Sequence, residues 1–211
     1  MRESPSKVEQ GTAVEPRAKS AEERILQAGK RLFAAKGFDQ TTTAAIAREA
    51  GSSESQLIKY FENKDGLLRA IFEDGWQRLS FVYNAAAIAE SPEEKLRVIF
   101  ELIARALQED RELRNLMLFE GRRVRSQSSE ILLTTGYYRL ISEVETLVAP
   151  LLKTSGLQRE LSPRAVASAL IGMLESMLRD QAIAERRDGK SQPKGEEIRA
   201  MFRLMIGCFK K

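Results

Sequence analysis

Apolar residues recur every three or four positions along most of this 211-residue chain, which is the spacing of helices that each bury one face. The first predicted helix covers about residues 21–36, and Gly37 follows its last turn. Two short helices follow within residues 42–61, and a long helix runs from Asn63 to about residue 89. The pattern therefore predicts an all-α fold.

Beyond residue 90 the pattern predicts a second, larger set of helices. Ser91 and Pro92 provide an N-cap and an N1 proline for the first of them, and Ser162 and Pro163 do the same for a later one. Pro150 is expected to kink its helix or to mark the last turns. These helices cover about residues 92–107, 112–121, 129–153, 163–187 and 196–211, with a polar exposed connection over 121–129. The first of them is expected to bury an inner stripe formed by Leu96, Ile99, Phe100, Ile103 and Leu107.

The two short helices are separated by so few residues that they form a helix-turn-helix. Gly51 stops the first one, because glycine adopts the left-handed conformation without a Cβ clash. Ser53 is a suitable N-cap for the second, and Gln56 three residues later completes a capping box. Leu57 and Phe61 face the first helix, which leaves a polar face outward. That face suits a DNA major groove. The alternative is that the two helices only form a packing corner in an all-helical protein.

The segment from Gly37 to Leu68 resembles the DNA-binding segment of the TetR family of transcriptional regulators. The residues that carry the resemblance are Gly37, Phe38, Thr41, Thr42, Ile46, Ala47, Ala50, Gly51, Ser53, Leu57, Tyr60, Phe61, Lys64 and Leu68. Two positions depart from the family pattern, which usually has glycine in place of Ser55 and tyrosine in place of Ile58. Isoleucine cannot donate a hydrogen bond to a phosphate as that tyrosine does, so Ile58 is not counted among the DNA contacts.

The resemblance implies a homodimeric repressor that a small-molecule inducer releases from a palindromic DNA operator. Residues 21–68 would form a three-helix DNA-binding domain, and residues 69–211 a larger helical domain for ligand binding and dimerisation. Residues 1–20 are polar and contain two prolines, so we expect a disordered arm that either trails along DNA or is inert. A helical interaction module of the same fold, or a DNA binder without ligand response, is the alternative.

The second short helix is the predicted recognition helix. Gln56 and Lys59 are expected to reach base edges, while neighbouring hydroxyl groups hold phosphates. Glu54 either accepts from a cytosine or stabilises the helix dipole. Lys64 stands at a helix start, and its family position makes it an expected phosphate contact. The predicted DNA-binding residues are Thr42, Thr43, Ser53, Glu54, Ser55, Gln56, Lys59, Tyr60 and Lys64.

The segment 165–178 is apolar or small almost all round its helix, and a helix of that kind must be covered on every side. One subunit of this size cannot supply the whole cover, so a partner subunit is the simplest source. The last helix repeats the apolar pattern, which predicts a four-helix interface between two copies. The predicted interface residues are Ala167, Leu170, Ile171, Gly172, Leu174, Met201, Phe202, Met205 and Phe209.

Aromatic residues and methionines in the second domain could enclose a small hydrophobic or amphipathic ligand, or they could only fill the core. The predicted pocket residues are Phe100, Ile103, Leu107, Met117, Glu120, Tyr137, Tyr138, Ile141, Met173 and Met177. Glu120 and Glu175 are polar exceptions on apolar segments. If either faces a cavity, a cationic or hydroxylated ligand is favoured.

Composition argues against an enzyme. Histidine is absent and Cys208 is the one cysteine, which removes the commonest general base and any zinc site built from these side chains. No glycine-rich nucleotide motif is present either, so we expect no catalytic residues, no metal and no cofactor. Cys208 lies in an apolar helix and is predicted to be a buried structural thiol.

Charge and hydropathy add little to the picture of the DNA-binding half. The formal net charge of +4 is compatible with a nucleic-acid partner but does not establish one. The first residues lack the apolar stretch of a secretory signal, and the longest apolar or small-residue run, 165–174, is about half of a bilayer span. We therefore expect a cytoplasmic protein with no membrane partner.

Overall fold

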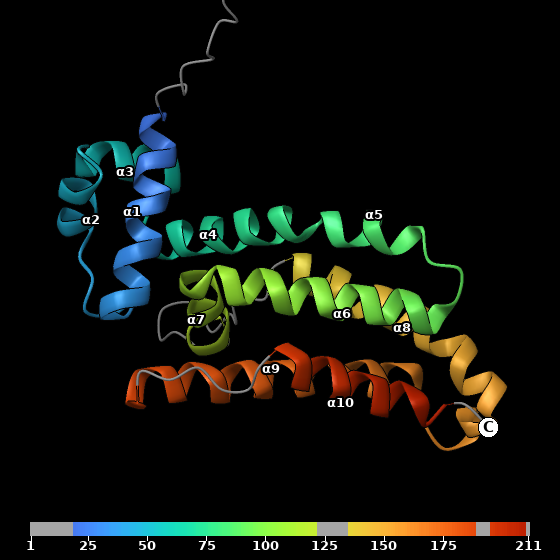
Figure 1. Cartoon of the computed structure of the whole chain (residues 1–211). Coiled ribbons are helices and arrows are strands. Elements are labelled where there is room, and N and C mark those ends of the chain that lie inside the picture. The colour runs from blue at the N-terminus through green and yellow to red at the C-terminus, as the bar shows by residue number, and fades with distance from the viewer. Residues whose placement is uncertain (1–18, 122–134, 189–194, 210–211) are drawn as a thin grey trace, which may run out of the picture.

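The computed structural model describes residues 19–121, 135–188 and 195–209, and every regular element in these ranges is helical (Figure 1). The elements are α1 (Ala21–Lys36), α2 (Thr43–Glu49), α3 (Glu54–Phe61), α4 (Lys64–Leu79), α5 (Phe81–Ala87), α6 (Pro92–Glu109), α7 (Arg111–Phe119), α8 (Thr135–Ser155), a 3-10 turn (Leu157–Arg159), α9 (Pro163–Asp188) and α10 (Gly195–Gly207). The predicted all-α fold is confirmed. Most of the predicted arm and the start of the helix predicted over 129–153 lie outside the described residues.

Helices α1 to α3 form a three-helix unit at one end of the molecule (Figure 1). Ser20 caps α1 through a capping box: its hydroxyl accepts from the Glu23 N–H at 3.1 Å, and its own N–H donates to the Glu23 carboxylate at 2.8 Å. The apolar faces of the helices meet in one core. Its buried residues include Ile25, Ala28, Phe33, Phe38, Ile46, Ala50, Leu57 and Phe61, with Leu67, Leu68 and Ile71 from α4.

Helix α4 carries the chain from this unit along the second domain (Figure 1). Asn63 caps it as predicted, because its side-chain oxygen accepts from the Gly66 N–H at 2.8 Å. The prediction of one helix as far as residue 89 is wrong at Ser80. The Ser80 N–H bonds to the Gln77 carbonyl at 3.1 Å, three residues back, and this tighter turn separates α4 from α5.

The second domain is a bundle of helices around its own core. Ser91 and Ser162 cap α6 and α9 as predicted, accepting from the N–H groups of Glu94 and Ala165 at 3.1 Å each. Pro150 lies within the last turns of α8, which continues to Ser155. The predicted inner stripe of α6 is buried at Leu96, Ile99, Phe100, Ile103 and Leu107.

Helix α7 lies between the two domains and contributes to both cores. Leu116 is buried in the core of the N-terminal unit, whereas Leu113 is buried in the second core. At its start, the Asp110 carboxylate caps α7 by accepting from the Leu113 N–H at 3.0 Å. The same carboxylate accepts from the buried Lys30 ammonium of α1 at 2.5 Å. Helix α1 is therefore fastened by an ion pair to the junction of α6 and α7.

Candidate nucleic-acid interface and ligand cavity

The turn between α2 and α3 has the conformation that the sequence predicts. Gly51 adopts a positive φ of 57°, and the next residue returns its N–H to the Ala47 carbonyl at 2.9 Å. The Ser53 hydroxyl then caps α3 by accepting from the Gln56 N–H at 3.2 Å. The second half of the predicted capping box is wrong, because the Gln56 side chain instead accepts from the Ser52 hydroxyl.

Helix α3 buries one face and exposes the other. Leu57 and Phe61 are buried against the rest of the unit, as predicted. The side chains of Glu54, Ser55, Gln56, Lys59 and Tyr60 are exposed. Thr42, at the N-cap of α2, is exposed as well, and Thr43 is half-buried. The predicted contact residues of the helix-turn-helix therefore share an accessible surface, and contact with DNA remains a prediction.

A hydrogen bond joins the starts of the two helices across this surface. The Thr43 hydroxyl donates to the Glu54 carboxylate at 2.6 Å. Because Thr43 opens α2 and Glu54 opens α3, the bond holds the two helix starts together. Glu54 is thus engaged within the protein, which neither of its two predicted roles anticipated.

Two basic residues fasten the helix-turn-helix to its surroundings, and only one of them was singled out in the sequence. Lys64 donates to the Phe38 and Thr41 carbonyls at 2.9 and 3.0 Å, and its ammonium lies 4.3 Å from the centre of the Phe38 ring. Arg24 of α1 donates to the Ala50 carbonyl at 3.0 Å. Lys64 has one N–H left for a phosphate, so its predicted contact stays open.

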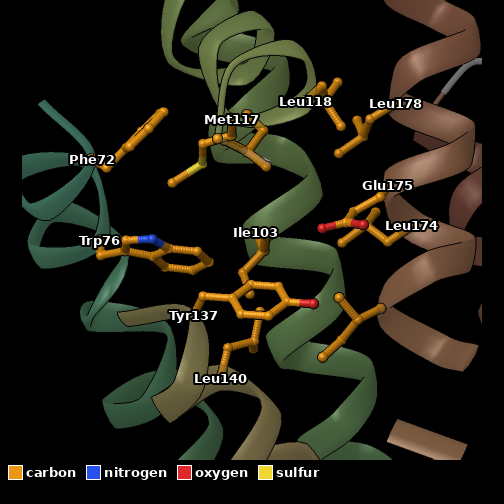
Figure 2. A pocket seen from close by; sticks show the side chains of 13 residues that line it. Phe72, Trp76, Ile103, Met117, Leu118, Tyr137, Leu140, Leu174, Glu175 and Leu178 are labelled. Atoms are coloured by element: carbon orange, nitrogen blue, oxygen red, sulfur yellow. The ribbon is translucent and has the colours of Figure 1, made fainter. Parts of the chain in front are cut away.

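The second domain contains a cavity of about 70 Å³ between α4, α6, α7, α8 and α9. Its lining is Phe72, Trp76, Ile103, Leu107, Met117, Leu118, Gly121, Tyr137, Leu140, Ile171, Leu174, Glu175 and Leu178. Figure 2 shows the aromatic rings of Trp76 and Tyr137 on one side and the Glu175 carboxylate pointing in from α9 on the other. Among the described residues that line the cavity, Glu175 is the only acidic or basic one.

The cavity includes part of the predicted pocket. Ile103, Leu107, Met117 and Tyr137 were among the predicted pocket residues and line this cavity, and binding of a ligand there stays a prediction. The other predicted residues lie outside the lining. Phe100 stacks on Phe202 with ring centroids 4.2 Å apart, and Ile141 and Glu120 are buried away from the cavity. Tyr138 is exposed, and Met173 and Met177 are half-buried against the core. Phe72 and Trp76 of α4 were not among the predicted pocket residues.

A buried ion pair ties two walls of the cavity, α7 and α9. The Arg114 side chain is 1% exposed and donates to the Glu185 carboxylate at 2.6 and 3.4 Å. Gln181 donates to the same carboxylate at 3.2 Å. Burial by itself would raise the pKa of Glu185, but the hydrogen bond and charge of Arg114 outweigh it, so the pKa is lowered. No sequence pattern indicated this pair.

Most of the predicted interface residues of α9 are covered within their own subunit. This corrects the argument that only a partner subunit could cover them. Five predicted interface residues are buried within their own subunit and cannot face a partner in this arrangement: Ala167, Leu170, Ile171, Leu174 and Phe202. Gly172 and Met201 are exposed, and Met205 and Phe209 are half-buried. The face of α9 that remains accessible consists mainly of small residues, Ser168, Ala169, Gly172 and Ser176.

Three further observations bear on the predicted chemistry. Cys208 is exposed, so the prediction of a buried thiol is wrong: it lies in the turn that follows α10, on a side that no described helix covers. Among the described residues, no group of three or more Cys, Asp or Glu side chains is placed to hold a metal ion. None of the described helices combines the length and apolar character that crossing a membrane requires.

Comparison with known proteins agrees with this fold. The family model of the bacterial regulatory proteins, tetR family, matches residues 25–71. Nucleoid occlusion factor SlmA of Vibrio vulnificus (strain YJ016) is 24% identical over 181 residues, which cover 81% of this chain and 87% of SlmA. The fatty acid degradation regulator FadR from Bacillus halodurans superposes with a TM-score of 0.76 at 18% identity, covering 92% of this chain and 99% of that one.

A second FadR structure, from Bacillus subtilis in complex with stearoyl-CoA, superposes with a TM-score of 0.73 at 15% identity and covers 89% and 96% of the two chains. At such identities the superpositions establish the fold alone. Support for transcription regulation through DNA binding comes instead from the matched helix-turn-helix model. Residues 25–71 of this chain therefore match the helix-turn-helix domain of the tetR family of bacterial regulatory proteins, and the described helices adopt the overall fold of the two solved regulators.

Proposed function

We propose that this protein is a homodimeric repressor that binds a palindromic operator and leaves it when a hydrophobic or amphipathic small molecule enters the second domain. The observation that carries the proposal is the exposed polar face of α3, held in place by the Ser53 cap and the bond between Thr43 and Glu54. Such a face offers donors and acceptors to base edges and phosphates at once.

The accessible faces of α9 and α10 support dimerisation. Gly172 has open space where a Cβ would stand, and its neighbours Ser168 and Ser176 are exposed one turn to either side. Small residues in this arrangement let a second helix approach closely. On α10, Met201 and Leu204 are 40% and 65% exposed, which leaves apolar area for a partner to cover. Figure 1 shows α9 and α10 together on the side of the molecule opposite α4 and α5.

The ligand that we propose first is a long-chain acyl thioester of coenzyme A. The lining of the cavity is apolar except for the polar side-chain atoms of Trp76, Tyr137 and Glu175. FadR of Bacillus subtilis, which shares the fold, was solved with stearoyl-CoA. The cavity of about 70 Å³ is smaller than the chain of such a ligand. Binding would therefore separate the helices that enclose it, and these include α4, which leads to the recognition helix.

Glu175 favours a second ligand class. A carboxylate that points into an apolar cavity is stabilised by a cation or by a hydrogen-bond donor, and it disfavours a plain alkyl chain beside it. A hydrophobic amine or alcohol would bring a cation or a hydrogen-bond donor within reach of this carboxylate. The substitution Glu175→Gln separates the two classes, since it weakens the response to an amine and leaves or improves the response to an acyl thioester.

The test begins with selection of operators from a random DNA duplex pool by the purified full chain. We expect enrichment of a two-fold symmetric sequence, and fluorescence anisotropy should then show weaker operator binding when stearoyl-CoA is added. Free coenzyme A serves as the control without an acyl chain, and alkylamines of matched length test the second class. Salt must be held constant, because phosphate contacts make DNA affinity strongly dependent on it.

Each outcome has a defined meaning. If no sequence is enriched, the protein is not a sequence-specific regulator, and the alternative function, a helical interaction module, is favoured. If an operator is enriched but neither ligand class changes its affinity, the protein is a DNA binder without response to these ligands. The relative SlmA is named for nucleoid occlusion, and a role in nucleoid occlusion would then be favoured.

A further inference from the structure

Ile58 interrupts the polar surface of the recognition helix. Its side chain is 55% exposed and belongs to neither buried core, although its neighbours Leu57 and Phe61 are buried. Ile58 lies one helical turn from Glu54 and Ser55, which are both exposed. Single exposed apolar residues are common on protein surfaces, but this one lies on the helix that faces DNA in the proposed function.

The arrangement of α3 leaves Ile58 uncovered by the protein itself. Helix α3 lies at the outer edge of the molecule, away from α9 and α10 (Figure 1). The nearby polar groups Glu54 and Gln56 are already engaged with Thr43 and Ser52. Ile58 has no polar atom on its side chain, so it cannot join such bonds, and among the described residues it belongs to neither apolar core.

One feature of the DNA major groove matches an isoleucine. The groove edges present hydrogen-bonding groups on every base pair, but only thymine adds an apolar group, the methyl on C5. Contact between an aliphatic side chain and this methyl buries both from water and stabilises the complex. A phosphate, by contrast, gains nothing from isoleucine, because the side chain carries neither charge nor donor.

We propose that Ile58 is a specificity-determining residue that reads the C5-methyl group of one thymine in each operator half-site. The proposal rests on the proposed function, because it requires α3 to enter the major groove of a specific operator. It concerns a single methyl group, so it can fail while operator binding itself stands.

The experiment uses the operator that the wild-type chain selects from the random duplex pool. Each thymine of one half-site is replaced in turn by deoxyuridine, with the symmetric position replaced in the other half-site. Deoxyuridine lacks the C5-methyl group but pairs in the same way, so only the apolar contact is removed. We expect one position at which wild-type affinity falls by about fourfold per half-site, the effect of losing one buried methyl group.

The variant Ile58→Ala should lose affinity for the thymine operator and become insensitive to deoxyuridine at that same position. Ile88→Ala is the matched control, because Ile88 is 86% exposed at the end of α5, outside the helix-turn-helix, and its variant should behave as wild type. Circular dichroism of both variants verifies that the helices are retained.

The inference is overturned if no thymine is sensitive to loss of its methyl group, or if Ile58→Ala remains as sensitive as wild type. It is also overturned if Ile58→Ala weakens binding equally at every substituted operator, because that result indicates a contact with the sugar-phosphate backbone. Failure of the wild-type chain to select any operator would instead contradict the proposed function.

Discussion

The two domains place their functional residues in different ways. The proposed DNA surface comes from about twenty consecutive residues, and the caps and turn that shape it join residues at most a few positions apart, as in Ser53 with Gln56. The cavity is lined from five helices, and Phe72 and Leu178 belong to distant parts of the chain. Residues close together in the sequence are enough to shape the DNA surface, whereas the cavity depends on how these five helices pack against one another.

Because the second domain depends on how distant helices pack, ion pairs that join such helices should contribute most to its stability. The variant with the largest expected effect tests this prediction. Arg114→Ala removes a fully buried guanidinium and leaves the Glu185 carboxylate, which is 12% exposed, without its main partner. Breaking a buried pair on one side costs about 3 kcal/mol of unfolding free energy. Urea unfolding followed by circular dichroism measures the loss.

Arg111→Ala is the control for that variant. Arg111 also approaches Glu185, at 3.8 Å, but its side chain is well exposed, so its removal should cost less than about 0.5 kcal/mol. Equal losses in the two variants would show that the net charge around Glu185 matters and that the buried geometry does not. A two-step unfolding curve for Arg114→Ala, with the first step in the second domain, would sharpen the contrast between the domains.

The same difference explains how much of each domain could be predicted from the sequence. The bounds of α1, the caps at Ser53, Asn63, Ser91 and Ser162, and the buried stripe of α6 were predicted because each depends on neighbours along one helix. The break at Ser80 was not predicted, because the apolar period continues through it.

The cavity and the faces of α9 could be predicted only in part. Met117 and Tyr137 were named from their residue types, but the same reasoning named Phe100, which stacks on Phe202 outside the lining. Composition cannot tell a wall of a cavity from a filled core, since both are apolar. For α9, the sequence could not show that Leu170 and Ile171 are covered within their own subunit, whereas Gly172 stays accessible.

The second prediction concerns the ion pair that joins the domains. Lys30→Met keeps the apolar stem of the side chain but removes the ammonium that Asp110 accepts from, at a cost of about 1.5 kcal/mol in unfolding free energy. Because the pair fastens α1 to the junction of α6 and α7, its loss should also reduce the change in operator affinity that a ligand produces. Anisotropy titrations with and without stearoyl-CoA measure that change.

Arg31→Ala serves as its control, because the pair of Arg31 with Glu49 at 3.1 Å is exposed on both sides and connects two helices of the same domain. It should leave both the stability and the ligand effect close to wild type. If Lys30→Met loses stability but the ligand effect is undiminished, the ion pair holds the domains together without transmitting the signal, and α4 alone would carry the coupling.

The third prediction compares equivalent caps in the two domains. Ser53→Ala and Ser91→Ala each remove a hydroxyl that accepts from an N–H three residues later, so each should cost about 1 kcal/mol of unfolding free energy. Only Ser53 precedes the recognition helix. Operator affinity should therefore fall by about fivefold for Ser53→Ala and stay within about twofold for Ser91→Ala. Similar affinities for the two variants would indicate that the first turn of α3 does not contact DNA.

The smallest expected effect is the pH dependence that Glu185 contributes to the second domain. Its pKa is lowered in the folded protein because Arg114 stabilises the carboxylate by more than burial destabilises it. An acid with a lowered folded pKa stabilises the folded state fully at pH values above its unfolded pKa, which is about 4.3 for glutamate. That contribution decreases as the pH falls below this value and is lost once the pH passes the folded pKa. Urea midpoints measured from pH 7 downward should therefore fall less steeply in Glu185→Gln than in wild type below about pH 5. Parallel profiles would mean that the Arg114 pair does not contribute through the charge of Glu185, and the difference between the domains would then rest on packing alone.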